Sequence, residues 1–222
     1  MKLYAISKAM PFLLKGFRYT LLIVGCSIPL AFVVSLLLTL MALSTSRILR
    51  MVTTVYVKIF RNIPFMIQVY LMYYAVPAFF GVRVPPLQAG IVALGLYAGC
   101  LYFIVIKMGV DSIPKGQFEA AKALRIPYMT TLRRIVFPQI IPIVIPPLIN
   151  QVVSSIKESS VLSIITVSEL TMMANEAIGQ TYAPLEVFLT AGIFYWAINL
   201  VIEFFGKWVG RRHSGYSRNL AA

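Results

Sequence analysis

Ionisable side chains are scarce in this sequence. Only 12% of the 222 residues are charged, whereas 59% are hydrophobic. Soluble domains carry about a quarter charged residues, so a surface this apolar requires the lipid bilayer as its solvent. Acidic residues are the scarcest, with 7 Asp and Glu against 20 Lys and Arg. The basic excess lies at the ends of apolar runs and not on a soluble scaffold, which argues against nucleic-acid binding.

Residue types that carry catalysis or bind metals are also rare. The chain has one histidine, His213, and two cysteines, Cys26 and Cys100, which both lie inside apolar runs. It has no CxxC, no P-loop and no metal-ligand spacing. A membrane-embedded enzyme would need a cluster of His, Cys or carboxylates. The sequence therefore predicts no catalytic residue, no metal and no cofactor bound by this chain. The first apolar run is too long for a cleavable signal peptide.

Long apolar runs with few charges are what the sequence does contain. A helix needs about 20 residues to cross roughly 30 Å of hydrocarbon. We therefore expect an all-α membrane protein with five transmembrane helices and one transmembrane domain over residues 19–210. The expected spans are 19–43, 58–81, 86–107, 138–156 and 186–207.

Lysine and arginine predict the orientation of these spans. They gather in the link after the first span, in the link between the third and fourth, and at the C-terminal end from residue 207 onward, which includes the tail 211–222. These residues are Arg47, Arg50, Lys58, Arg61, Lys107, Lys115, Lys122, Arg125, Arg133, Arg134, Lys207, Arg211, Arg212 and Arg218. The opposite loops carry only Arg83 and Lys157. The positive-inside rule places the richer segments in the cytoplasm, with the N-terminus outside and the C-terminus inside.

Two outer segments have patterns of their own. Residues 1–18 mix basic and apolar residues at roughly helical spacing, which predicts an amphipathic helix on the outer membrane surface. A sixth, partial span is the rival interpretation. The charge-free stretch 159–168 is too short to span and suits a re-entrant helix packed on protein. Glu169, Glu176 and Glu186 are expected to be solvated or to contact a partner from outside.

The cytoplasmic loop 112–137 predicts a short helix, a turn and a second short helix. Ser112 is a suitable N-cap and Pro114 fits a first helical turn. Pro127 disfavours helix at the residue before it, and the second helix is expected to end at Pro138. Two alanines beside Glu119 form a flat surface that suits docking into a groove of another protein. The alternative is an ordinary amphipathic connection.

The residues of this loop resemble the "EAA" coupling motif of bacterial ABC-importer permeases. The match is carried by Gly116-Gln117-Phe118-Glu119-Ala120-Ala121-Lys122-Ala123-Leu124 and Ile135-Val136-Phe137-Pro138-Gln139. The leading Gly-Gln and closing Pro-Gln are typical of the polar amino-acid branch, the histidine/glutamine type. Three further segments match that branch in order, over nearly the whole chain. They are Tyr56 to Pro64 with Gln68, Pro146 to Gln151 with Lys157 to Val161, and Ser168-Glu169-Leu170.

The resemblance implies an assembly in the bacterial inner membrane. Two permeases, identical or homologous, enclose a path for a small polar substrate. Two cytoplasmic ATP-binding subunits hold ATP and Mg, and a periplasmic or lipid-anchored solute-binding protein delivers substrate. The implied ATPase-coupling residues are Gly116, Gln117, Glu119, Ala120, Ala121, Leu124 and Arg125. Motif residues with an implied structural role are Tyr56, Arg61, Pro64 and Pro138.

The chain departs from the family pattern at two places. Arg125 stands where the family has glycine after the coupling helix. A positive φ at arginine would cost about 1 kcal/mol, unless Ile126-Pro127 forms a different turn. We expect Arg125 to be a tolerated variant of this turn and not a contact with the ATPase subunit. In the third span, no acidic residue precedes Lys107. The resemblance therefore does not imply a functional carboxylate in the third span of this chain.

Polar residues within the spans are the candidates for the substrate path. Polar groups are costly in a bilayer and usually face protein or water. The expected path residues are Gln68, Tyr73, Asn150, Gln151, Ser154, Lys157, Glu158, Ser159 and Ser160. The alternative is that they join helices to one another.

Two other functions are the alternatives to amino-acid import. One is an ABC permease for another small solute, such as an amino-acid derivative or opine. The other is a secondary transporter or channel without an ATPase, which would favour inverted repeats or an intramembrane carboxylate relay. The sequence shows neither feature.

Overall fold

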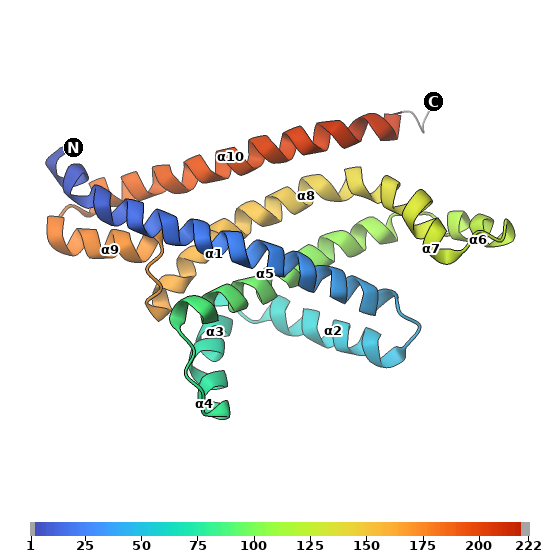
Figure 1. Cartoon of the computed structure of the whole chain (residues 1–222), viewed down its shortest axis with the longest axis horizontal. Helices are drawn as coiled ribbons and strands as arrows, with labels where there is room; N and C mark the ends of the chain where they lie inside the picture. Colours follow the sequence, from blue (N-terminus) through green and yellow to red (C-terminus); the bar gives the residue numbers. More distant parts are fainter. Residues whose placement is uncertain (1–2, 219–222) are drawn as a thin grey trace.

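Four long helices run side by side along the molecule. The computed structural model describes residues 3–218, and that range is helical with no strand in it. The long helices are α1 (Leu3–Leu43), α5 (Pro86–Asp111), α8 (Phe137–Glu158) and α10 (Pro184–Arg218) (Figure 1). Each lies in a helical segment long and apolar enough to cross a membrane. The all-α membrane fold is confirmed.

The expected second span is broken in the structure. Helix α2 (Arg47–Asn62) is followed by α3 (Phe65–Tyr70), η1 (Leu71–Ala75) and α4 (Val76–Phe80), which turn away by 110°. Pro64 has no N–H and disfavours helix at Ile63, whose ψ is 130°. Residues 58–62 therefore belong to α2. The described chain has four candidate spans, or five if the bent pair is one span.

The expected surface helix over residues 1–18 is not a separate element. From residue 3 onward it is the start of α1, with no break at residue 18, and residues 1–2 lie outside the described part. Ala9 and Leu13 are fully buried against α9 (Leu170–Thr181) and α10. Protein therefore covers part of the apolar face that predicted a lipid contact, while Leu14 remains exposed.

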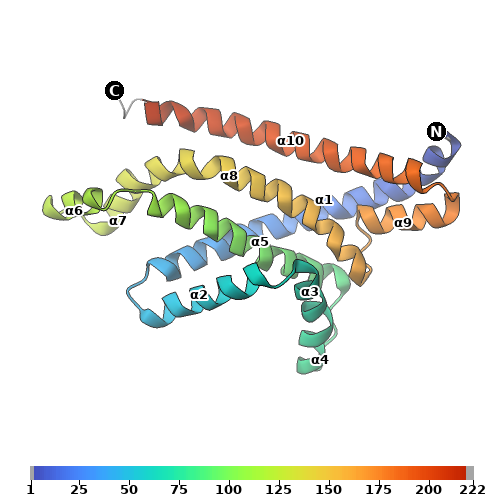
Figure 2. The ribbon, with the colours of Figure 1, turned by 180° about the vertical axis from the view of Figure 1, so that it is seen from behind.

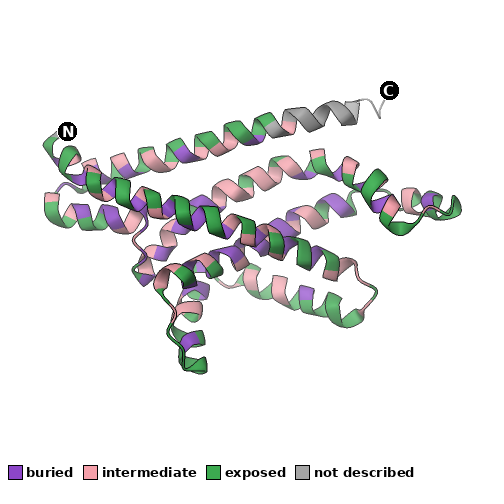
Figure 3. Ribbon diagram, in the orientation of Figure 1, coloured by how far each residue is buried: buried purple, intermediate pink, exposed green. Residues whose placement is uncertain are grey.

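Small residues allow the central helices to approach closely. Helix α5 lies between α1, α2 and α8 (Figure 2). A Cβ on Gly95 would lie 2.5 Å from Leu30 of α1, and one on Gly99 would lie 2.7 Å from Val34. Such small-residue contacts are typical of transmembrane helix pairs. Burial is concentrated along α5, whereas the flanking helices keep exposed faces (Figure 3).

The two ends of the bundle differ in construction. At the end near the N-terminus, α8 continues into the 3-10 helix η3 (Ser159–Ile165), which precedes α9. This short element packs on protein, with Leu162 fully buried. We call this the α9 end. The opposite, α6 end holds α6 (Lys115–Ala123), α7 (Tyr128–Thr131) and the π-turn η2 (Leu132–Val136) (Figure 1).

The second loop helix does not end at Pro138. Helix α7, η2 and α8 follow one another without an interruption, and Pro138 lies in the first turn of α8. A proline ring clashes with the carbonyl four residues earlier in an ordinary helix. The wider turn of η2 lies directly before this proline and gives its ring space.

Candidate functional site

Helix α6 presents one exposed face and one anchored face. Pro114 is extended, with ψ 132°, and α6 begins at the next residue. Phe118 packs into an apolar cluster with Ile113 and Leu132, and Ala121 is 4% exposed. The remaining predicted coupling residues point outward or lie at the edge. Gly116, Glu119, Ala120, Leu124 and Arg125 are exposed and Gln117 is half-buried.

A groove of about 400 Å³ lies between α6 and the start of α8. It is lined by Gln117, Ala120, Ala121, Leu124, Ile126, Ile135 and Gln139. Two glutamines supply its only polar side chains, and no lining side chain is ionisable. Each glutamine Nε2 donates to the Oε1 of the other, at 3.0 Å from Gln117 and 2.8 Å from Gln139. The amide pair therefore joins α6 directly to α8.

Arg125 adopts the left-handed conformation that the family gives to glycine. Its φ is 55°, and its N–H donates to the Lys122 carbonyl at 3.0 Å. The Ile126 N–H donates to the Ala121 carbonyl at 2.9 Å. These two bonds form a Schellman C-cap. The turn is the usual one, with arginine at a strained position, and Arg125 has no ion-pair partner among residues 3–208.

Gln68 lies at the corner between α2 and α3. Its Nε2 donates to the Phe60 carbonyl at 3.0 Å and to the Ile63 carbonyl at 2.7 Å. Phe60 lies four residues before Pro64, so its carbonyl lacks the N–H that proline cannot donate. Gln68 supplies that missing donor from a buried position. Tyr56 ties the same region to α5 through a 2.9 Å hydrogen bond to the Leu96 carbonyl.

The expected path residues differ in how far they are exposed. Asn150 is exposed in a groove of about 510 Å³ between α8 and α10, with Glu203 and Lys207 also lining it. Ser159 is fully buried and donates to the Ile156 carbonyl at 2.7 Å. The others lie between these extremes. Lys157 is exposed, while Tyr73, Gln151, Ser154, Glu158 and Ser160 are half-buried.

Sequence reasoning missed a buried contact between α5 and α8. The Tyr102 hydroxyl and Ser155 Oγ are 3.1 Å apart, and both side chains are buried. Ser155 also donates to the Gln151 carbonyl at 2.8 Å. The repeat of polar residues four apart on α8 signalled this face, but nothing in the sequence indicated a tyrosine opposite it.

Glu169 is the clearest correction at the α9 end. The sequence predicts a solvated residue, yet Glu169 is fully buried as the N-cap of α9. Its carboxylate accepts the N–H of Thr171 at 2.9 Å, the N–H of Met172 at 2.7 Å and the Tyr195 hydroxyl at 2.8 Å. Burial raises the pKa of Glu169, although the hydrogen bonds it accepts act to lower that pKa. An acidic residue directly before a helix is an N-cap signal that could have predicted this role.

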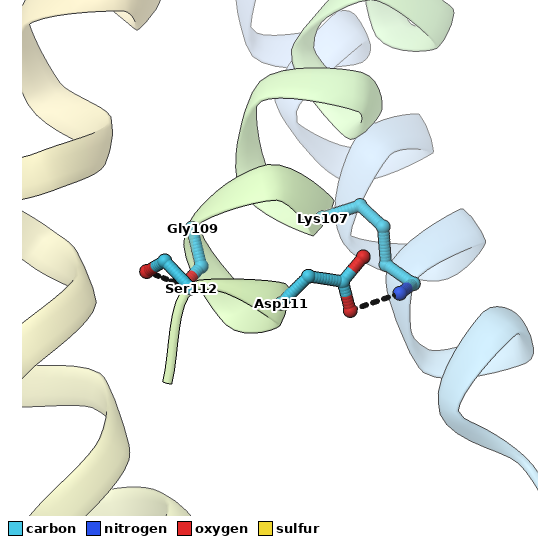
Figure 4. A network of polar contacts seen from close by, with 4 residues as sticks. All are labelled: Lys107, Gly109, Asp111 and Ser112. Atoms are coloured by element: carbon cyan, nitrogen blue, oxygen red, sulfur yellow. Dashed lines mark hydrogen bonds and ion pairs between the residues drawn. The ribbon is translucent and has the colours of Figure 1, made fainter. Parts of the chain in front are cut away.

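The end of α5 next to α6 carries its own polar contacts. Lys107 pairs with Asp111 one turn later, and Ser112 Oγ donates to the Gly109 carbonyl at 2.7 Å (Figure 4). Gly109 lies against the side chain of Val144 of α8, so a Cβ at this position would overlap with it. The acidic partner of Lys107 therefore follows it in the chain, and α5 touches α8 where the loop to α6 begins.

Comparison with known proteins identifies the family. Residues 31–215 match the model of the binding-protein-dependent transport system inner membrane component. The chain belongs to this family. Its members are permease subunits of ABC importers, with the ATPase on separate chains. The match confirms the resemblance found in the sequence.

Relatives and a solved structure match over nearly the whole chain. The arginine transport system permease ArtQ of Bacillus subtilis is 31% identical, over 91% of this chain and 92% of that protein. The nopaline transport system permease NocM of Agrobacterium fabrum is 36% identical, over 91% and 88%. A crystal structure of an amino acid ABC transporter with histidines superposes with a TM-score of 0.87 at 25% identity, over 96% and 99%.

Proposed function

We propose that this chain is the permease subunit of an ATP-driven importer for polar amino acids. The observation that carries the proposal is the family match over residues 31–215 together with the whole-length similarity to amino-acid permeases. The exposed face of α6 supports it, because a short helix held outside the long bundle suits docking on another subunit. The chain would form half of the path.

The assembly would contain three kinds of partner. A second permease, identical or homologous, would complete the path. Two ATP-binding subunits would hold ATP and Mg at the α6 end, and a solute-binding protein would dock at the α9 end. The basic residues near the α6 end favour a cytoplasmic position for it. The bacterial inner membrane, five crossings and an outer N-terminus follow as parts of this proposal.

Within α6 the predicted coupling residues divide into two roles. Glu119, Ala120 and Leu124 are exposed and would contact the ATPase subunit. Ala121 faces inward, and its small side chain lets α6 lie close to the residues beneath it. Arg125 serves the turn after α6. Gly116 has open space around its Cα, so its place would be at the docking surface.

On α8 the exposed residues are the better candidates for the path. Asn150 and Lys157 are exposed, and Glu158 is half-buried. Their side chains remain available to a substrate or to the second permease. Gln68 and Ser159 already have hydrogen-bond partners that stabilise the fold. We assign these two residues to structure and keep the first three in the path.

A second substrate class has specific support. The nopaline permease is 36% identical, a higher identity than that of the arginine permease at 31%. An amino-acid derivative such as an opine is therefore the second candidate. A shared preference for a polar amino-acid group would account for both relatives.

Co-purification and reconstitution test the proposed function. The tagged permease should retain an ATP-hydrolysing subunit after solubilisation. In proteoliposomes with the binding protein, arginine, histidine, glutamine and nopaline would be added one at a time. Stimulated ATP hydrolysis by one amino acid supports the first candidate, and stimulation by nopaline alone supports the second. Uptake without any ATPase subunit would contradict both.

A further inference from the structure

The amide pair between Gln117 and Gln139 has a fixed orientation. Besides its bonds to Gln117, Gln139 Nε2 donates to the Ile135 carbonyl at 2.7 Å. A carbonyl can only accept a hydrogen bond, so the nitrogen of Gln139 must face it. Its oxygen is thereby left for Gln117 Nε2, and Gln117 must turn its own oxygen to Gln139. One backbone carbonyl thus determines the orientation of both amides.

The pair links two elements that are distant along the chain. Gln117 lies in α6 and Gln139 in the first turn of α8, 22 residues later. Among the hydrogen bonds of the described residues, theirs are the ones that join α6 to α8. Phe118 also packs against an apolar cluster that includes Leu132 of η2 and Ile140 of α8. Apolar contacts permit sliding, whereas paired amides require one alignment.

We propose that Gln117 and Gln139 are positioning residues that make α6 and the start of α8 one rigid unit. A displacement of α6 by a docked ATPase subunit would then move α8 directly. The chain connection through η2 would not need to transmit it. Helix α8 carries Asn150, Lys157 and Glu158, so the unit links the docking surface to the proposed path. This inference rests on the proposed function.

The surroundings make the pair sensitive to substitution. No ionisable side chain lines the groove, and its other lining residues are Ala120, Ala121, Leu124, Ile126 and Ile135. An amide that loses its partner therefore finds no replacement side chain there. A half-buried polar group that loses its hydrogen-bond partner destabilises this arrangement. Helix α6 would then no longer be held in one alignment on α8.

The double variant Gln117→Glu/Gln139→Glu tests the proposal most directly. It preserves side-chain shape but places two carboxylates in contact. Substrate uptake per ATP hydrolysed is measured in the reconstituted wild-type and variant complexes at pH 7.5. We expect the ratio to fall about tenfold, with ATP hydrolysis retained but no longer stimulated by substrate.

Acid should restore the double variant. Two adjacent carboxylates raise the pKa of one of them, and the protonated group can donate to the other. At pH 5.5 the uptake ratio, relative to the wild type at the same pH, should recover several-fold. A loss that acid does not reverse would show a general structural defect and would overturn the proposal.

The two single variants provide an independent comparison. Gln117→Glu loses its one donation, to Gln139 Oε1, but keeps an acceptor for Gln139 Nε2, so its uptake ratio should fall by only about twofold. Gln139→Glu removes both donations by Gln139 and places a carboxylate against the Ile135 carbonyl. Its uptake ratio should fall several-fold. Equal ratios in these two variants would contradict the proposal, and this comparison decides it if the double variant does not assemble.

The control is Gln88→Glu, which makes the same amide-to-carboxylate change at an exposed glutamine of α5, outside α6, α8 and α9. It should retain the wild-type ratio at both pH values. A double Gln117/Gln139 variant that also keeps that ratio at pH 7.5 overturns the positioning role. If the wild-type complex itself shows no ATP-driven uptake, the proposed function fails instead.

Discussion

The α9 end and the α6 end of the bundle are held together by different kinds of contact. At the α9 end, a fully buried carboxylate, Glu169, is surrounded by donors from α9 and α10. At the α6 end, a short exposed helix is held by Phe118, Ala121 and a neutral amide pair. The α9 end thus encloses an ionisable group between packed helices, whereas the α6 end holds its exposed helix through neutral side chains.

The difference indicates which end can move. A buried carboxylate that loses its donors is severely destabilised, so helices that enclose one separate at high cost. The neutral amide pair joins α6 only to α8, so moving these two together does not break it. The α9 end is therefore expected to be rigid within the subunit. The α6 end can shift as a unit with α8 when a partner displaces it.

The largest expected effect is loss of coupling from a bulky residue on α6. Ala120 is exposed and faces the groove edge, so Ala120→Trp should leave the permease folded but block the ATPase subunit. We expect substrate uptake to disappear. The measurement is co-purification of the ATPase subunit together with reconstituted uptake.

The control for this variant is Asn175→Trp, at an exposed position on α9. It introduces the same bulky side chain at the opposite end of the bundle and should retain the ATPase subunit. Normal uptake in Ala120→Trp would count against the docking role of α6.

The largest loss of stability is expected at Glu169. Glu169→Ala leaves the Thr171 and Met172 N–H groups and the Tyr195 hydroxyl without their acceptor. The expected cost is about 2–4 kcal/mol, from a lost N-cap and unsatisfied buried donors. Thermal unfolding of the purified permease in detergent measures it. Glu176→Ala, at an exposed position of the same helix, should leave the midpoint unchanged; equal midpoints in both variants would refute the burial of Glu169.

The apolar runs predict most of the helices, but they do not predict which helices pack against one another. The long spans are visible because about 20 apolar residues cross a bilayer. The sequence did not show that residues 3–18 continue α1, because an apolar face packed on α9 and one packed on lipid have the same periodicity. Pro64 is recognisable in the sequence as a helix breaker. That Gln68 supplies the donor in place of the missing N–H is seen only in the structure.

The site was predictable to a similar extent. The loop motif located α6, and Arg125 has the left-handed φ, 55°, that the glycine position of the family implies. The pairing of Gln117 with Gln139 was not predictable, because 22 residues and a π-turn separate them. The prediction for Glu169 was wrong because charge usually indicates exposure, although its N-cap position was available from the sequence.

Close packing at the α9 end gives the next largest effect. A Cβ on Gly16 would lie 2.8 Å from the Leu170 Cα and 3.0 Å from the Glu169 carbonyl oxygen. Backbone atoms cannot yield as a flexible side chain does, so Gly16→Ala should destabilise the permease by about 1–3 kcal/mol. Gly25→Ala on the same helix meets nothing within 4 Å and should be neutral or slightly stabilising. Unfolding midpoints of the two variants test this contrast, and a neutral Gly16→Ala would mean that α1 does not press on α9.

The smallest effect is expected at Arg125, where the two ends can be compared through their turns. Arg125→Gly relieves a left-handed arginine and should stabilise the turn by about 1 kcal/mol at most. Because we assign Arg125 to the turn and not to the ATPase contact, substrate-stimulated ATP hydrolysis should be unchanged. The matched variant is Tyr182→Gly, at the left-handed residue that ends α9 with φ 50°. Both variants should raise the unfolding midpoint slightly. If Arg125→Gly alone abolishes stimulation, Arg125 contacts the ATPase subunit, and the α6 end uses a charge at its docking surface after all.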